Sequence, residues 1–317
     1  MSQRVADMRD VALLTAAAVF GAFLLAALPI VGVPLEAAAL ATLAYRFRES
    51  TAWLAALVAV ATVALISWPT ALVLVAPMIV AAGPLSARAL RFRPALAVAV
   101  FIGVAVFFAT LASLLLDAAQ AGKPLLAYID GEMATALQGL VAGAPKSSST
   151  AGLDPVALRS QMIMLLPGWF VLMSALTGVL GTLAIAWAGL KAGVTTRRFP
   201  KLTELQISTY ALVPIIAGLL ALAVARVTAG STASVLSMIG GNLLVIGVPL
   251  LTLQGLGIVL FWLTKLHVPR WGRVAATLGA FVVEPIMPVL TLVGLMDTWF
   301  DFRRLRKSET EDRNERD

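Results

Sequence analysis

Residues 51–87 read TAWLAALVAVATVALISWPTALVLVAPMIVAAGPLSA and contain no charged side chain. Further uncharged stretches cover residues 94–116, 160–190, 205–225 and 227–264. A helix that crosses a membrane needs about 20 mainly apolar residues, so each of these stretches is long enough for a span. The chain of 317 residues is 60% hydrophobic and 13% charged, whereas an average soluble domain is about 25% charged. We therefore expect an all-α, polytopic transmembrane helix bundle.

The apolar pattern predicts about eight to nine membrane segments. They are Val11–Gly32, Pro34–Tyr45, Thr51–Ser67, Ala71–Ala87, Pro94–Leu116, Gln161–Leu190, Ile207–Ala225, one within Thr232–Thr264, and Val274–Met296. The ninth contains Glu284-Pro285-Ile286-Met287-Pro288 at its centre. Two prolines and a carboxylate there favour a broken helix or a re-entrant hairpin. The alternative is nine full spans, with the C-terminus outside.

The loops between these segments predict the orientation. Basic residues follow every even-numbered segment: Arg46 and Arg48; Arg88, Arg91 and Arg93; Lys191, Arg197, Arg198 and Lys201; Lys265, Arg270 and Arg273. The loop of residues 117–159 instead holds three cations and four carboxylates, a net charge of −1. Because cytoplasmic loops are enriched in Lys and Arg, we expect the N-terminus in the cytoplasm of a bacterial inner membrane and this loop outside. The apolar spacing of Pro124–Ala142 predicts a helix on the outer surface.

Composition also limits the domain organisation and the chemistry. We expect one integral membrane domain over residues 1–317, with a six-span core (11–190), an external loop (117–160), a cytoplasmic loop (191–206), additional spans (207–303) and a polar tail (304–317). The net charge of +7 is divided among short loops, which indicates contact with the lipid bilayer and not with nucleic acid. With no cysteine, one histidine and no catalytic motif, we expect no metal, no cofactor, no catalytic residue and no enzyme activity.

Two carboxylates lie within apolar segments, where an ionisable group costs about 2.5–3.5 kcal/mol on insertion scales. Glu36 either lines an outward-facing pocket as a substrate-binding group or lies at the interface and caps a helix start beside Pro34. Glu284 either binds substrate or satisfies backbone N–H groups that the broken helix leaves free. Asn242 and Gln254 predict hydrogen bonds between helices.

Several segments carry a resemblance to known families. Alanine-rich Ala12–Ala27, Pro29, Pro34 and Tyr45-Arg46-Phe47-Arg48 resemble the substrate-binding subunits of energy-coupling-factor transporters. The whole chain is similar to the YybS-like family of bacterial membrane proteins, through Arg198-Phe199-Pro200, Leu253-Gln254-Gly255-Leu256 and Gly294-Leu295-Met296-Asp297-Thr298-Trp299-Phe300-Asp301-Phe302-Arg303. The resemblance implies a six-helix core with a ligand cavity open to the outside. It also implies that Ala12 with Ala16, and Ala18 with Ala22, contact a coupling subunit that works with an ATPase subunit.

The last of these motifs combines Asp297, Trp299, Asp301 and Arg303, and its role is not evident from the sequence. The two aspartates are four residues apart and share a helix face, from which Arg304 and Lys307 are expected to pair with them.

Two functions remain open. The first is a small-solute-binding or transport component of the membrane. The alternative is a non-transporting membrane scaffold or assembly factor. Glu284 at mid-depth, the prolines within spans and the broken last segment favour the first. The lack of charged residues in the third to eighth segments favours the second, since polar substrates need polar partners.

Overall fold

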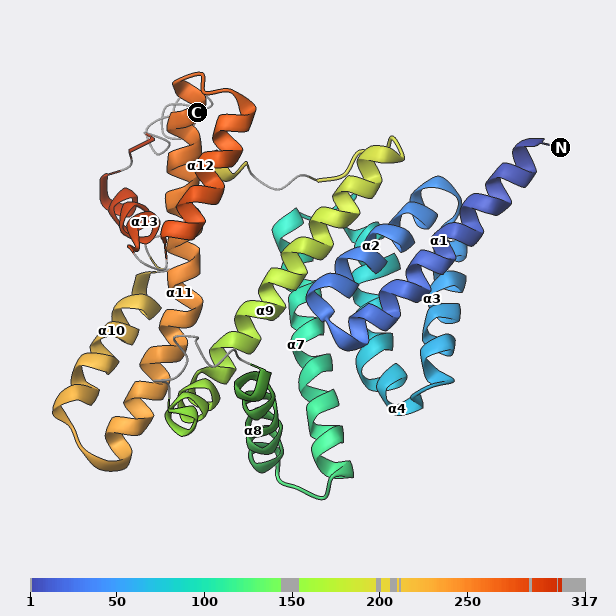
Figure 1. Cartoon of the computed structure of the whole chain (residues 1–317). Helices are drawn as coiled ribbons and strands as arrows, with labels where there is room; N and C mark the ends of the chain where they lie inside the picture. The colour runs from blue at the N-terminus through green and yellow to red at the C-terminus, as the bar shows by residue number, and fades with distance from the viewer. Residues whose placement is uncertain are drawn as a thin grey trace. The chain divides into compact units, whose positions relative to one another are not determined.

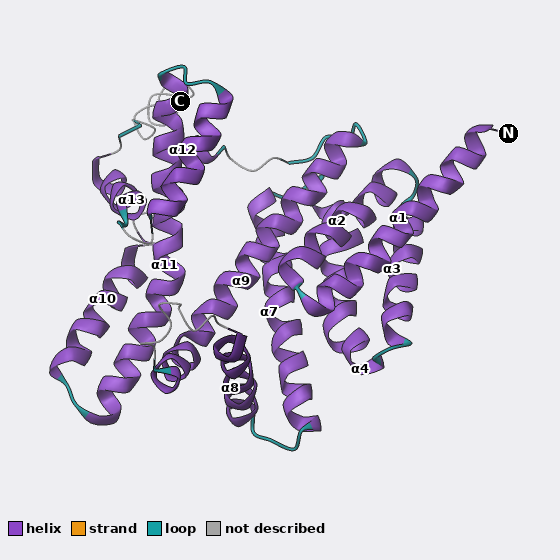
Figure 2. Ribbon diagram, in the orientation of Figure 1, coloured by secondary structure: helices purple, strands orange, loops and turns teal. Residues whose placement is uncertain are grey.

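The computed structural model describes residues 2–143, 154–197, 201–205, 210, 212–284, 287–300 and 302–303. Within these ranges every regular element is a helix, as Figure 2 shows. Five helical segments are long and apolar enough to cross a membrane: Asp7–Ala27, Trp68–Ala89, Ala95–Gln120, Val156–Lys191 and Gly230–Lys265. Shorter apolar helices are Glu49–Ala64, Leu212–Val227 and Val289–Phe300. The all-α class is confirmed for the described residues, and the five candidate spans are consistent with a multi-pass membrane protein. The count of eight to nine segments and the side of the N-terminus stay predictions.

The chain divides into two compact units. The first comprises Met1–Ile163 with Phe170–Phe199, and the second comprises Met164–Trp169 with Pro200–Asp317. The long helix α9 (Pro155–Lys191) contributes residues to both.

Unit 1 is a bundle of helices with an alanine-rich core. Its other elements are α1 (Ser2–Ala27), α2 (Pro29–Arg46), α3 (Glu49–Ala64), α4 (Trp68–Thr70), η1 (Ala71–Val75), α5 (Ala76–Val80), η2 (Ala81–Leu85), α6 (Ser86–Ala89), α7 (Ala95–Gln120) and α8 (Leu125–Gly143) (Figure 1). Small side chains let the helix backbones approach closely. At Gly178 of α9, for example, an added Cβ would lie 2.2 Å from the carbonyl oxygen of Ala99 on α7.

The boundary between the first two predicted segments is wrong. Val11–Gly32 was expected as one span, but α1 ends at Ala27 and α2 begins at Pro29. The reason is that a proline at the first position of a helix needs no N–H partner and has a helical φ already. Pro34 then lies inside α2, and Glu36 is about 10 Å along the helix from its start.

The apolar segment Trp68–Ala89 is not a regular helix. Two short π-helical stretches, η1 and η2, alternate with α-helical turns, and Gly83 has non-helical angles of φ −88° and ψ −109°. Prolines interrupt helical hydrogen bonding, and Pro77 and Pro84 both fall in this segment. The regular span expected over Ala71–Ala87 is therefore kinked.

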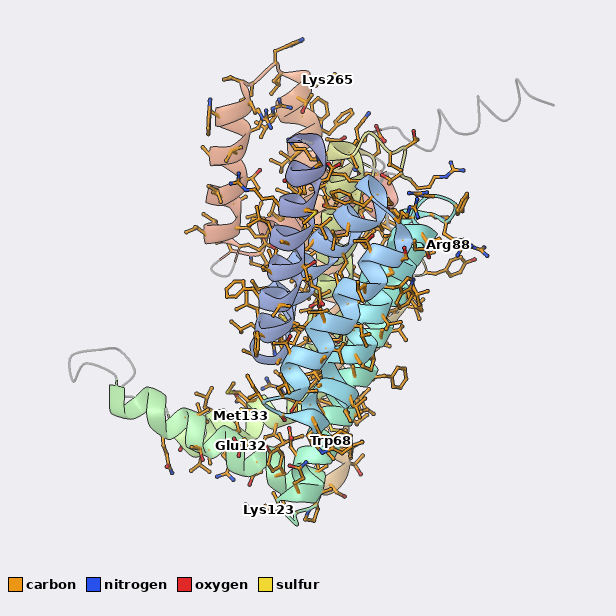
Figure 3. All side chains as sticks on the ribbon, turned by 90° about the vertical axis from the view of Figure 1, so that its right-hand side faces the viewer. Trp68, Arg88, Lys123, Glu132, Met133 and Lys265 are labelled. Carbon is orange, nitrogen blue, oxygen red and sulfur yellow. The ribbon has the colours of Figure 1, made fainter. Side chains whose placement is uncertain are left out.

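At one end of unit 1, α8 forms where the sequence predicted a surface helix, which confirms the helix. Asp130 of α8 pairs with Arg159 near the start of α9, and the Asp154 side chain caps α9 by accepting from the Val156 N–H at 2.9 Å. In Figure 3, Lys123 and Glu132 lie at the same end of the unit as Trp68, and Arg88 lies at the opposite end.

Unit 2 is built on one long helix, α11 (Gly230–Lys265). The elements α10 (Leu212–Val227), α13 (Val289–Phe300), the 3₁₀ turn η4 (Leu202–Glu204) and α12 (Arg270–Val283) all contact it. The predicted break in the last apolar stretch is confirmed, since α12 ends at Val283 and α13 begins at Val289. Whether the two pieces re-enter the membrane stays a prediction.

Candidate functional site

Glu36 lies inside the core of unit 1. Its side chain is fully buried, and neither carboxylate oxygen has a hydrogen-bond partner among the residues that the structure describes. Helix α1 passes directly over it, because an added Cβ on Gly21 would lie 3.0 Å from the Cβ of Glu36. Of the two possibilities for Glu36, a cap at the start of a helix does not match this position, since α2 begins seven residues earlier.

The irregular segment Trp68–Ala89 runs beside Glu36 on a second side. Tyr45 of α2 donates to the Ala87 carbonyl at 2.6 Å, and an added Cβ on Gly83 would lie 2.5 Å from Cδ1 of Leu40. This parallel register brings the turn of Glu36 to the level of α5, which contacts α2. Glu36 therefore lies beside the irregular segment. π-helical stretches of this kind occur frequently at functional sites.

Glu284 has a different environment. It follows the last residue of α12 and caps the start of α13. Its oxygens accept from the backbone N–H groups of Leu290 (2.8 Å) and Thr291 (2.9 Å) and from the Thr291 hydroxyl (2.6 Å). Such bonds satisfy the donors that the first turn of a helix leaves free. The structural alternative proposed for this carboxylate is thus present in the molecule.

The C-terminal motif forms a buried ion pair in unit 2. Nη2 of Arg303 donates to Oδ2 of Asp297 at 2.8 Å, and both side chains are fully buried. Asp297 also accepts from Nε2 of Gln254 on α11 (3.1 Å) and from the Phe302 backbone N–H (2.9 Å).

Arg303 in turn holds the segment before α10. Its guanidinium donates to the carbonyl oxygens of Thr203 (3.0 Å) and Leu205 (2.8 Å). The partners predicted for Asp297 by helical spacing, Arg304 and Lys307, lie outside the described residues, as does Asp301. The pairing of Asp297 with Arg304 or Lys307 therefore stays a prediction. The observed partner, Arg303, follows the end of α13 at Phe300.

Two of the recognised motifs meet at this ion pair. Gly255 and Gly294 let α11 and α13 touch, since an added Cβ on Gly255 would lie 1.9 Å from the Leu290 carbonyl and one on Gly294 would lie 2.1 Å from the Leu251 carbonyl. Trp299 points away and is exposed. The motif Leu253-Gln254-Gly255-Leu256 on α11 and the C-terminal motif that begins at Gly294 on α13 therefore pack directly against each other. Arg198-Phe199-Pro200 lies outside the described residues.

The remaining predicted residues lie on helices of both units. Ala18 and Ala22 are fully buried in the core of unit 1, whereas Ala12 and Ala16 are exposed on α1. Asn242 donates to the Met164 carbonyl at 2.7 Å and accepts from the Gly168 N–H. Asn242 and Gln254 therefore both make the predicted bonds between helices. The described residues contain no group of three or more His, Asp or Glu side chains able to hold a metal ion.

A family model described as Predicted membrane protein (DUF2232) matches residues 13–298. The chain belongs to this family. The DUF2232 match includes Glu36, Gln254, Glu284 and Asp297, and it ends before Arg303. No curated protein and no solved structure is significantly similar to the chain.

Sequence reasoning missed two features of this DUF2232 protein. The pairing of Asp297 with Arg303 depends on a turn that helical spacing does not predict. A pocket between Tyr45, Arg88 and Arg91 also escaped notice, because the arginines were used only to assign the orientation. The signal available for it was the presence of basic and aromatic residues in the two segments that line the pocket, residues 45–48 and 88–91.

Proposed function

We propose that this protein is a membrane component that binds or transports a small solute, with Glu36 as the polar group of the binding site. The observation that carries the proposal is the complete burial of Glu36 without a hydrogen-bond partner among the described residues. An enzymatic function is not part of the proposal.

The physical argument rests on the cost of such a group. A polar group buried without a partner destabilises a folded protein by about 1–3 kcal/mol, and an ionised one by more. An apolar residue of similar size at position 36 would avoid that cost and fill the same space. A carboxylate there is consequently useful only if a proton, a cation or a hydrogen-bond donor of a ligand meets it during function.

The surroundings of Glu36 indicate the chemistry of that ligand. The buried core of unit 1 is apolar and consists mainly of alanine, valine, leucine and isoleucine side chains, and small-molecule sites combine apolar walls with a few placed polar groups. We expect a small, largely apolar solute with one cationic or hydrogen-bond-donating group. Glu284, with both oxygens used in a helix cap, is the weaker candidate for substrate binding.

The setting of the site follows the sequence analysis. We propose eight to nine membrane segments in a bacterial cytoplasmic membrane, with the N-terminus and the Arg88 end of unit 1 in the cytoplasm. The separation of Arg88 from Lys123 and Glu132 to opposite ends supports this orientation (Figure 3). If the resemblance to energy-coupling-factor subunits and to the YybS-like family extends to partners, the exposed Ala12 and Ala16 are where a coupling subunit would pack, and an ATPase subunit would complete the assembly.

The test compares Glu36→Leu with the unmodified protein in mild detergent. Without ligand, we expect Glu36→Leu to raise the melting temperature, because it removes an unpartnered carboxylate from the core. Small molecules that co-purify with the unmodified protein are identified by mass spectrometry and added back. A ligand at 100 times its Kd stabilises the native state by about 2.7 kcal/mol, and we expect this stabilisation to be lost in Glu36→Leu.

The matched control is Glu132→Gln, which neutralises an exposed carboxylate on α8 and should change neither melting temperature nor ligand response. A lower melting temperature in Glu36→Leu, together with no co-purifying small molecule, would contradict the proposal. That result would favour the alternative, a non-transporting scaffold or assembly factor.

A further inference from the structure

A pocket of about 350 Å³ opens at the end of unit 1 opposite Lys123. It lies where α2 turns into α3 and where the irregular segment Trp68–Ala89 ends. Three arginines and one glutamate line it, Arg48, Arg88, Arg91 and Glu49, which gives a net charge of +2. This volume is within the range of small-molecule sites, about 300–1,000 Å³.

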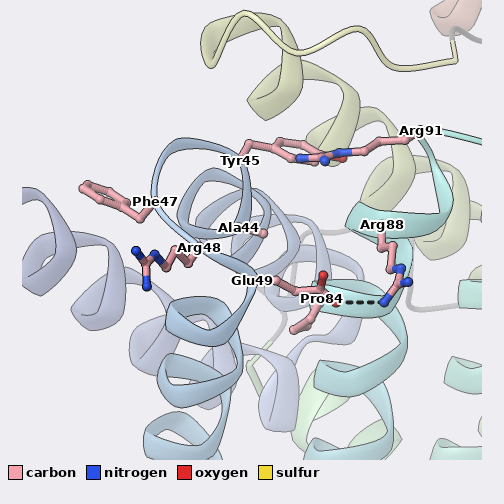
Figure 4. Close-up of a pocket in the computed structure, with 8 residues that line it drawn as sticks. All are labelled: Ala44, Tyr45, Phe47, Arg48, Glu49, Pro84, Arg88 and Arg91. Atoms are coloured by element: carbon pink, nitrogen blue, oxygen red, sulfur yellow. Dashed lines mark ion pairs between the residues drawn. The ribbon is translucent and has the colours of Figure 1, made fainter.

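Arg91 is held in place by an aromatic ring. Its guanidinium carbon lies 5.0 Å from the centre of the Tyr45 ring, within the range of a cation–π contact. The ring is fixed in turn, because the Tyr45 hydroxyl donates to the Ala87 carbonyl at 2.6 Å. Figure 4 shows the guanidinium plane along the ring. A contact of this kind uses the face of the guanidinium, so its N–H edge can still donate to an anion.

Arg88 supplies the second cation. It is paired with Glu49 at 3.7 Å (Figure 4), which is longer than a hydrogen bond. The side chains are 70% and 45% exposed, and exposed pairs of this kind contribute about 0–1 kcal/mol. The pair is therefore easily exchanged for a stronger anion. Arg48 extends away from Arg88 and Arg91 in this view, so it adds positive potential more than direct contact.

We propose that this pocket binds a phosphate group, which accepts hydrogen bonds from Arg88 and Arg91. Guanidinium groups match the geometry of phosphate oxygens and bind them through two parallel N–H donors. Any phosphate also reduces the +2 charge of the lining: a phosphodiester carries one negative charge and a phosphate monoester close to two. The phosphate belongs either to the headgroup of an anionic phospholipid, since basic pockets between membrane helices bind such headgroups, or to a soluble phosphorylated solute. The inference does not depend on Glu36.

The experiment uses the full chain, freed of lipid in mild detergent, and measures its melting temperature. In one arm, pyrophosphate is added, with sodium chloride at equal ionic strength as reference. In the other arm, the protein is placed in nanodiscs of phosphatidylcholine with or without phosphatidylglycerol. A shift with pyrophosphate identifies a soluble phosphate as the ligand type, and a shift only with phosphatidylglycerol identifies a lipid. Either result supports the proposal, and no shift in both arms overturns it.

Variants connect the shift to the pocket. A hydrogen bond to a charged group contributes about 1.5–3 kcal/mol, so Arg88→Ala and Arg91→Ala should each weaken binding roughly ten- to hundred-fold. Arg91→Lys keeps the charge but loses the paired donors, and it should also bind more weakly. The control is Arg93→Ala, which removes the same charge from the same loop outside the pocket. Equal weakening in Arg93→Ala would show that the effect depends only on net charge, and this would overturn the proposal. Glu36→Leu should bind phosphate as the unmodified protein does, because Glu36 does not line this pocket.

Discussion

Replacing Asp297 by Asn removes the negative charge of the buried ion pair and keeps the size of the side chain. The guanidinium of Arg303 then remains fully buried without a counter-charge. Removing one partner of a buried pair costs about 3–5 kcal/mol. For a chain of this size, we expect the melting temperature of Asp297→Asn to fall on the order of 10 °C.

Arg303→Met should be more damaging. It leaves Asp297 unpaired and also removes the donors to the carbonyls of Thr203 and Leu205. Each lost hydrogen bond from the charged guanidinium adds about 1.5–3 kcal/mol, so we expect a total of roughly 6–11 kcal/mol. The double variant, which carries both substitutions, has no unpaired charge and retains only the carbonyl losses, about 3–6 kcal/mol. It should therefore be more stable than Arg303→Met, and its loss should be smaller than the sum of the two single losses.

The assay is thermal unfolding of the purified chain in detergent, followed by intrinsic tryptophan fluorescence. The matched control is Lys201→Met, which breaks an exposed ion pair with Glu204 on the same segment and should cost less than about 1 kcal/mol. A double variant whose loss equals the sum of the two single losses would refute the reasoning, because it would show that Asp297 and Arg303 do not act as a pair.

Two further predictions follow from close contacts and from loop charge. Gly294→Ala should lower stability by about 1–3 kcal/mol, because the new Cβ meets the Leu251 carbonyl. The control Gly279→Ala has no atom within 4 Å of the new Cβ and should be neutral or stabilising by up to about 1 kcal/mol. Equal melting temperatures of the two variants would contradict this prediction. In this cysteine-free chain, a single cysteine at position 148 should react with an impermeant reagent added outside cells, and one at position 196 should not. The reverse pattern would invert the proposed orientation.

Much of the fold could be predicted because it depends on local sequence. Uncharged stretches predict helices, the apolar spacing of Pro124–Ala142 predicts α8, and the two prolines after Glu284 predict the break before α13. The predicted end of the first span was wrong because two local signals disagree there, the continuous apolar composition and a proline that starts a helix. Pro29 begins a helix and thereby ends the first span at Ala27, although the apolar composition continues without interruption.

The pairing within the C-terminal motif shows a second limit. Helical spacing relates residues only while the helix continues. Once α13 ends at Phe300, the position of Arg303 depends on a turn and on two carbonyls about 100 residues earlier in the chain. The motif was recognisable in the sequence, but the segment that it holds in place was not.

Glu36 and Asp297 are both completely buried carboxylates, and the contrast between them distinguishes structure from function. Asp297 accepts from three donors on its own and neighbouring segments. Its burial is therefore compensated within the protein, and its bond to Gln254 helps to hold α13 against α11. Glu36 has no such donor among the described residues, so the burial of its carboxyl group is not compensated by any of them. Both lie in apolar sequence, and only the tertiary contacts separate the two cases. The complete burial of Glu36 without a hydrogen-bond partner among the described residues is the observation that supports the ligand site proposed for unit 1.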